Sequence, residues 1–243
     1  MRCWWRGICE TRDVWTVFRT FCLCETGLWP AVFRRNDVGL MRHRAPLLWP
    51  SVITPSDEVA AIKDLYAHLT GLQYSVEAWE AGLILYRTSL NATSSISSAV
   101  ARRWRFIACN ECVLELFHLR ARLEKIQSVK LRACPSLRPL IDTSLLRTAR
   151  KRLDEYFPDI VALRHSVAHM GENEAHAEVH APDGQYVLTG FRESDRLSTP
   201  YQGRLRHLDI TEQSLQRILE VVTDYFAAFD FAAKKLEHEG HLE

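Results

Sequence analysis

Between residues 55 and 127 the apolar positions recur at steps of three and four residues, the spacing of helices that bury one face. Residues 55–58 combine a capping serine with two acidic residues, which predicts a helix start. We expect this first helix to end near Gly71 and a second helix to follow it. A long third helix is expected at about residues 96–127, with its inward stripe formed by Val100, Trp104, Ile107, Leu114 and Phe117.

The second half of the chain changes from a helical pattern to short alternating runs and back. Apolar stripes predict two further helices, at residues 145–157 and 160–170. Short apolar runs at 186–189 and 205–208 are strand candidates joined by a long polar loop. Thr211 then caps a single final amphipathic helix. The sequence therefore predicts an all-α helical bundle with a small β-hairpin-like insertion before its last helix.

The first fifty residues differ in composition from the rest. They hold five of the seven tryptophans and four of the seven cysteines, and they show no sustained periodicity. Charged residues interrupt any apolar run that could serve as a secretion signal. We expect residues 1–50 to be an atypical leader or a mis-annotated start, with the true start at Met41 or later, and residues 51–243 to form the helical domain.

The overall composition is that of a globular protein, with 47% hydrophobic and 25% charged residues. No uncharged apolar run reaches the roughly 18 residues of a membrane helix, so we expect no membrane partner. The seven cysteines lack the spacing of a disulfide framework, which predicts reduced thiols in a cytoplasmic protein. Cys109 and Cys112 have no second cysteine pair, so we interpret them as small residues inside a packed helix.

A net charge of +1 conceals a marked asymmetry. Residues 102–164 carry 14 Lys or Arg against 7 Asp or Glu, whereas residues 165–243 carry 7 against 14. A basic middle beside an acidic end suits a polyanion site or head-to-tail self-association. One basic cluster could guide RNA phosphates or could simply form a solvated charged face; its members are Arg147, Arg150, Lys151 and Arg152.

The candidate chemistry lies in the sequence Arg-His-Ser-Val-Ala-His at residues 164–169. Arginine binds phosphate as a fixed and permanently charged fork, and histidine transfers protons near neutral pH. RNA cleavage requires a 2′-hydroxyl to lose its proton, a crowded phosphate to be stabilised and the leaving oxygen to be protonated. Arg164 with His165 and His169 is therefore a minimal set for cutting RNA without a metal or another cofactor.

Helical geometry predicts where these side chains point. His165 and His169 lie roughly 160° from the apolar face of their helix, toward solvent, a ligand or another chain. Arg164 and His169 are about 7.5 Å apart along the axis and about 140° apart around it. One helix presents the two awkwardly to a single phosphate, so two copies across a two-fold axis would close the site more easily.

The six residues 164–169 resemble the R-x4-6-H signature of the HEPN domain family, in which a polar residue often follows the arginine. The resemblance covers roughly residues 56–238 and implies a helical bundle that dimerises with the signature at its interface. Many members are metal-independent endoribonucleases of toxin–antitoxin, phage-defence or RNA-processing systems, and others only bind. It implies that Arg164 and His169 form the active site with support from His165, that RNA is the substrate, and that a homodimer or a cognate antitoxin is the partner.

One acidic residue is a further candidate for this site. Glu111 interrupts the predicted inward stripe of the long helix. An inward carboxylate needs a partner, and Arg164 is a candidate for that role. Alternatively, Glu111 lies at the edge of the stripe and has no such role.

Two other interpretations of the histidines stay open. His165, His169 and Glu172 recur on one helical face, with His176 and His180 beyond them, which allows a structural zinc site. The zinc-protease pattern is excluded, because Ser166 stands where that pattern needs its glutamate. The second interpretation is a bundle with exposed histidines that binds a partner and catalyses nothing.

Overall fold

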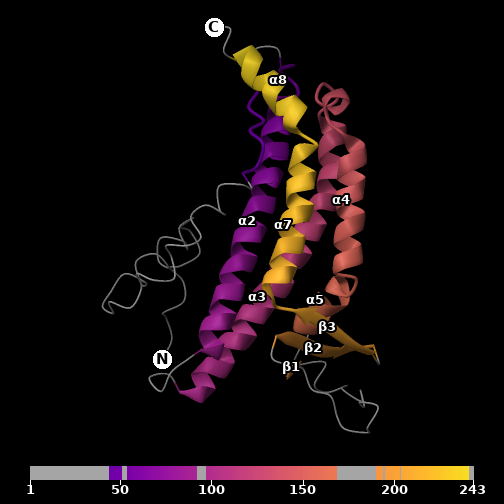
Figure 1. Ribbon diagram of the computed structural model, residues 1–243. Helices are drawn as coiled ribbons and strands as arrows, with labels where there is room; N and C mark the ends of the chain where they lie inside the picture. The colour runs from indigo at the N-terminus through magenta and orange to yellow at the C-terminus, as the bar shows by residue number, and fades with distance from the viewer. Residues whose placement is uncertain are drawn as a thin grey trace, which may run out of the picture. The chain divides into compact units, whose positions relative to one another are not determined.

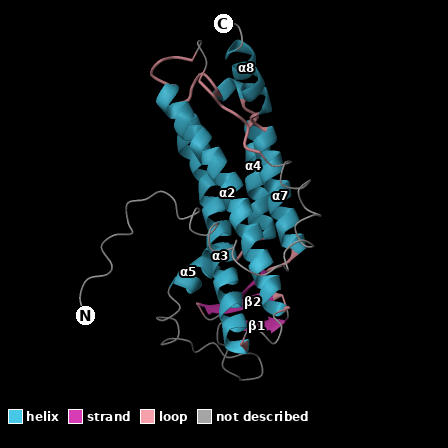
Figure 2. Cartoon of the chain, turned by 90° about the vertical axis from the view of Figure 1, so that its left-hand side faces the viewer, coloured by secondary structure: helices cyan, strands magenta, loops and turns pink. Residues whose placement is uncertain are grey.

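The structure is a computed structural model, and it describes residues 44–50, 54–91, 97–168, 190–193, 195–202 and 204–240. The chain divides into two compact units, Met1–Arg42 and His43–Glu243, and the description below concerns the second. It is mostly helical, with a small antiparallel sheet before the helices at its C-terminal end, as the sequence predicted. Figure 1 and Figure 2 show its long helices side by side, with the strands near one end of them.

The first two long helices, α2 (Val59–Leu90) and α3 (Ser98–Lys125), pack against each other along their length. Ser97 caps α3, because its side chain accepts a hydrogen bond from the backbone N–H of Val100. Beyond α3 the helix widens into a π turn and is followed by two short, tighter 3₁₀ turns, at Ile126–Lys130, Leu131–Ala133 and Arg138–Leu140.

The predicted break at Gly71 is wrong, because α2 runs through it as one helix of 32 residues. The glycine serves packing instead. A Cβ at this position would lie 3.0 Å from Nε and 3.2 Å from Cδ of Arg122 on α3. Gly71 therefore gives room to an arginine of the neighbouring helix, and the tertiary contact outweighs the low helix propensity of glycine.

The predicted inward stripe of α3 is also wrong. Val100 and Ile107 are 43% and 49% exposed. The buried face is offset around the helix and consists of Ala101, Ala108, Cys109, Cys112, Val113, Leu116, Leu119 and Leu123. Small residues occupy this face because α2 comes close at Gly82, where a Cβ would lie 2.7 Å from Sγ of Cys112 and 3.2 Å from the carbonyl oxygen of Ala108.

Cys109 and Cys112 lie inside this packed helix pair, which confirms their interpretation as small core residues. Both are free thiols, as is the buried Cys134. Burial raises the pKa of Cys109 to about 12 and that of Cys134 to about 11. These three thiols therefore stay protonated near neutral pH and behave as small apolar side chains.

Two further helices, α4 (Thr143–Tyr156) and α7 (Glu212–Ala227), complete the bundle. Thr211 caps α7 as predicted, since its hydroxyl oxygen accepts from the backbone N–H of Ser214. The single final helix expected after Thr211 is two helices, because α7 ends at Ala227 and α8 (Asp230–Gly240) follows. The carbonyl oxygen of Ala228 accepts the backbone N–H of Asp142, which ties this turn to the start of α4.

The insertion before α7 is a three-stranded antiparallel sheet in the order β1-β2-β3. Its strands are β1 (Gly190–Glu193), β2 (Arg196–Tyr201) and β3 (Arg204–Asp209). The run predicted at 205–208 lies within β3, and the one at 186–189 lies outside the described residues. In the β2–β3 hairpin, Leu197 pairs with Leu208 and both are buried against the bundle.

The helical unit begins before the boundary expected at residue 51. Leu48 is fully buried in the core cluster, and the backbone N–H of Ala45 donates to Oε1 of Gln73 on α2 at 3.1 Å. The compact unit starts at His43, so the stretch 44–50 packs with the bundle although the sequence analysis assigned it to the leader.

The close approach at Gly82 predicts a difference between two glycine substitutions. Gly82→Ala should lower the free energy of unfolding by about 1–3 kcal/mol, because the new methyl group meets Cys112 and a backbone carbonyl. Gly71→Ala should cost less, since the Arg122 side chain can move aside. Urea denaturation followed by circular dichroism measures both. Equal stability of the two variants would contradict this account of the α2–α3 contact.

Candidate functional site

The candidate signature residues lie on α5 (Ile160–Ala168), a nine-residue helix beside α3 and the sheet (Figure 1). Ile160 and Leu163 face the core and are buried, as the apolar spacing predicted. The start of α5 is fixed to the sheet by Asp159, whose carboxylate pairs with the Arg206 guanidinium of β3 at 2.7 Å. This pair places α5 between the bundle and the strands.

Ser166, in the middle of the signature, anchors α5 to β2. It is 1% exposed, and its hydroxyl bonds to the hydroxyl of Thr199 and donates to the carbonyl oxygen of Pro200 at 3.2 Å. The sequence analysis missed this role, although Ser166 follows the buried Leu163 by three residues and so shares its face. The buried hydroxyl orients the signature helix through a polar contact rather than through apolar packing.

Arg164 lies half-buried over an aromatic ring of α3. Its Cζ is 5.3 Å from the ring centroid of Phe117, a distance at which a guanidinium is attracted to the ring face. Within the described part of the chain no carboxylate forms an ion pair with Arg164. The ring supports the guanidinium carbon, and the N–H donors, which pair with no described carboxylate, are available to a ligand.

His165 does not lie free on an outer face as the helical geometry predicted. It is half-buried, and its ring stacks on that of Tyr201 with a centroid distance of 6.0 Å and an interplanar angle of 18°. The sheet covers this side of α5, a contact between segments about 35 residues apart that helical periodicity does not reveal. His165 therefore contributes to positioning α5 against β2.

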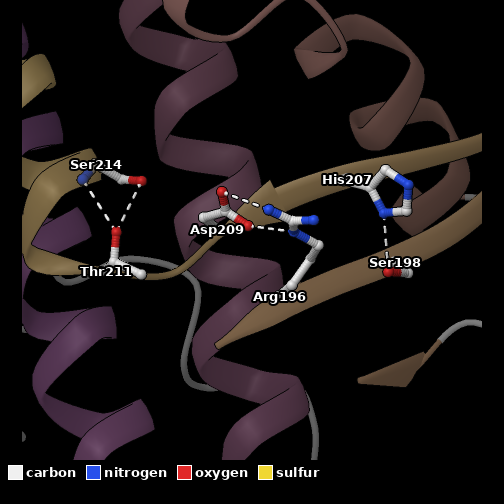
Figure 3. A network of polar contacts seen from close by, with 6 residues as sticks. All are labelled: Arg196, Ser198, His207, Asp209, Thr211 and Ser214. Carbon is white, nitrogen blue, oxygen red and sulfur yellow. Dashed lines mark hydrogen bonds and ion pairs between the residues drawn. The ribbon is translucent and has the colours of Figure 1, made fainter. Parts of the chain in front are cut away.

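A polar network keeps the hairpin that supports α5 in register, as Figure 3 shows. Arg196 of β2 and Asp209 of β3 form a two-pronged pair, with Nε–Oδ1 2.6 Å and Nη2–Oδ2 3.2 Å apart. Ser198 and His207, facing each other on the same strands, are joined by a hydrogen bond of 2.9 Å. The network fixes the hairpin that presents Thr199, Pro200 and Tyr201 to α5.

The second histidine of the signature, His169, lies just past α5 and outside the described residues. The same holds for Glu172, His176 and His180, the other members of the zinc alternative. Among the residues that the structure does describe, no group of three or more His, Cys, Asp or Glu side chains could hold a metal ion. The zinc alternative therefore stays a prediction, because most of the residues it needs lie outside the described ranges.

Glu111 does not face inward and does not pair with Arg164. It is exposed on α3, and partial burial together with the neighbouring Glu115 raises its pKa. Glu115 is the acid of α3 that enters a tertiary network, since it accepts a hydrogen bond of 2.8 Å from the Ser75 hydroxyl of α2. The offset of the α3 buried face explains the difference, because the same rotation carries Glu111 outward.

Within the described ranges, two residues of the basic cluster of α4 form ion pairs and the other two do not. Arg152 bonds to two acids of α7, Glu220 at 2.9 Å and Asp224, and so connects the two helices. Lys151 lies 3.4 Å from Glu155 one turn along the same helix, on the surface. Arg147 and Arg150 form no ion pair with any other described residue. Only these two of the four expected RNA-binding residues are thus unpaired cations.

Comparisons with known proteins assign no role to these residues. No family model matches the chain, and neither the curated proteins nor the solved structures contain a match. Within the ranges described above, no helix is both long and apolar enough to cross a membrane.

The buried hydroxyl pair between α5 and β2 generates a stability prediction. Ser166→Ala should lower the free energy of unfolding by about 1–3 kcal/mol, because the buried Thr199 hydroxyl and the Pro200 carbonyl each lose their hydrogen bond to Ser166. Ser128→Ala removes an exposed hydroxyl bonded within its own helix and should change stability little. Thermal unfolding of both variants provides the comparison, and a neutral Ser166→Ala would show that the contact does not hold α5.

Proposed function

We propose that the protein is a metal-independent endoribonuclease of the HEPN type, with Arg164 and His169 as its catalytic residues. The observation that carries this proposal is the state of Arg164. Its guanidinium is oriented by Phe117, lies near the surface and pairs with no described carboxylate. A permanent cation held in this way is suited to an anionic ligand such as a phosphate.

The two residues would divide the chemistry of RNA cleavage. The 2′-hydroxyl loses its proton and attacks the adjacent phosphorus, and the bond to the 5′-oxygen of the next nucleotide breaks. His169 is suited to one of the two proton transfers, removal from the 2′-oxygen or donation to the leaving 5′-oxygen. Arg164 would neutralise the charge that builds on the phosphate oxygens between these steps. The products are a 2′,3′-cyclic phosphate and a 5′-hydroxyl.

An exposed apolar stripe on α3 supports a second copy of the chain as partner. Val100 and Ile107 are exposed, and Trp104 and Leu114 on the same face are half-buried. The stripe approaches Phe117, the ring that carries Arg164. A two-fold contact along this stripe would bring two signature helices together and complete each site with residues of both copies.

A binding module without catalysis is the second candidate, and one observation favours it. His165 stacks on Tyr201 and Ser166 is buried against Thr199, so two of the six signature residues serve to attach α5 to the sheet. In that case Arg164 would recognise an anionic group of RNA or of a partner protein such as an antitoxin, and nothing would be cleaved.

The proposal predicts RNA cleavage by the full chain in excess EDTA. His169→Ala should reduce the rate at least about 100-fold, because a positioned proton donor or acceptor contributes a factor of about 10²–10⁴. Arg164→Ala should do the same, because losing one donor to the developing negative charge costs a factor of about 10²–10³. Arg164→Lys should recover little of the activity that Arg164→Ala loses, since lysine keeps the charge but not the planar fork of hydrogen-bond donors. Gel analysis of a labelled RNA measures the rates, and mass spectrometry identifies the cyclic phosphate end.

Lys63→Ala, on the exposed side of α2, is the matched control and should cleave at the wild-type rate. Activity lost in EDTA and recovered with zinc would contradict the metal-independent mechanism and favour the histidine–glutamate alternative. A folded protein that binds RNA but cleaves none would favour the binding module.

The α3 stripe predicts a dimer in solution that one charge can dissociate. Ile107→Glu should shift the mass measured by sedimentation equilibrium from dimer toward monomer, because a carboxylate at an apolar contact must lose its water. Ile84→Glu places the same charge at a 45% exposed position of α2 and should leave the mass unchanged. A monomeric wild type, or a dimer indifferent to Ile107→Glu, would contradict this interface.

A further inference from the structure

An arginine-lined pocket lies beside the first turns of α4, away from α5. It has a volume of about 160 Å³ and is lined by Gln127, Leu131, Arg132, Arg138, Thr143, Leu146 and Arg147. Its arginines come from three elements: Arg132 from the first 3₁₀ turn, Arg138 from the second and Arg147 from α4. The fold thus gathers three guanidinium groups that are up to 15 residues apart in the sequence.

The positive charge of this pocket is not neutralised by an ion pair with any residue that the structure describes. No carboxylate lines it, and none of its three arginines forms an ion pair there. Asp142, which precedes the lining residue Thr143, caps α4 instead and accepts from the backbone N–H groups of Ser144 and Leu145. Three like charges around one hollow repel one another, so a bound anion would make the arrangement more favourable.

One more feature of the pocket suits a phosphate. The side-chain nitrogen of Gln127 is buried and has no hydrogen-bond partner among the described residues, and Gln127 is itself a lining residue. Buried donors are rarely left unpaired, so this amide adds to the arginines. The N-terminal end of α4 does not, because Asp142 already accepts from its first N–H groups.

An open groove continues from the pocket along α4. It has a volume of about 420 Å³, shares Gln127 and Arg147 with the pocket, and is lined further on by Arg150, Lys151, Asp154 and Glu155. Both of its acids already have basic partners, because Asp154 accepts from Nε of Arg120 at 2.7 Å and Glu155 lies beside Lys151. The charge left over along the groove is therefore positive.

We infer that this pocket binds the terminal phosphate of an oligonucleotide whose backbone leaves along the α4 groove. A phosphomonoester carries about −1.5 to −2 charges near neutral pH, against −1 for a phosphodiester, so a pocket with three unpaired arginines favours the chain end. The groove adds the unpaired Arg150 to the shared Arg147, and these two charges suit the next phosphates of a backbone that carries one phosphate per nucleotide. No aromatic side chain lines pocket or groove, so binding rests on the charge of the phosphates rather than on stacking of the bases.

The site is separate from Arg164, so the inference stands even if the signature residues cleave nothing. The test uses the full chain and a short 2′-O-methyl oligoribonucleotide, which cannot be cleaved through its 2′-oxygen. Calorimetry compares three forms of it, with a 5′-phosphate, with a 3′-phosphate and with hydroxyls at both ends. We expect one phosphorylated form to bind at least about ten-fold more tightly than the hydroxyl form.

Variants locate the effect. Arg138→Gln should abolish the preference for the phosphorylated end. Arg150→Gln should weaken the binding of all three oligonucleotide forms and lower the slope of log Kd against log salt by about one. Arg102→Gln removes the same charge at an exposed position on the order of 35 Å along α3 from Gln127 and should change neither. Thermal unfolding checks that the variants are folded.

Several results would overturn the inference. Equal affinity for phosphorylated and hydroxyl ends, or a preference that survives Arg138→Gln, would remove the terminal-phosphate site. Inorganic phosphate that binds as tightly as the oligonucleotide would show that the groove contributes nothing and that a free anion is the ligand. Equally tight binding of a phosphopeptide without other charges would show that the ligand of the pocket is a phosphorylated protein rather than an oligonucleotide.

Discussion

The bundle depends on the close approach of α2 and α3 at Gly82. Only a hydrogen atom fits at this position, because any Cβ would lie 2.7 Å from Sγ of Cys112. The contact selects the small side chains of α3 for the interface with α2 and turns larger apolar ones, such as Ile107, toward the surface. The same rotation leaves Phe117 on the side where α5 packs, so that the support of Arg164 follows from a glycine 35 residues earlier.

The signature helix is held by polar contacts as much as by its apolar side. Ser166 bonds to Thr199, His165 stacks on Tyr201, and Asp159 pairs with Arg206. All three partners belong to the β2–β3 hairpin, which makes the small sheet a structural base for α5 rather than a peripheral insertion. Of the described residues of the signature, Arg164 is the one whose charged group is directed to no partner in the sheet.

Among the described residues, the arginines paired with carboxylates differ from those of the α4 pocket and Arg164, and this difference separates structure from candidate function. Arg120 and Arg152 connect α4 to α3 and α7 through carboxylates, and the guanidinium of Arg196 locks the hairpin through Asp209. Such pairs fix the relative positions of elements. The arginines of the α4 pocket and Arg164 have no carboxylate partner among the described residues, so their charge is available to a ligand.

The sequence by itself determined the mostly helical class, the cap at Thr211 and the buried side of α5, because hydrogen bonding and amphipathic spacing within a helix are local. It did not determine that α2 passes through Gly71, that α3 turns Ile107 outward, or that Glu111 lies away from Arg164. Nor did it reveal that Arg132 and Arg138 join Arg147 around one pocket. These outcomes rest on contacts between residues far apart in the chain, and only tertiary packing decides which face of a helix is covered and which charges find a partner.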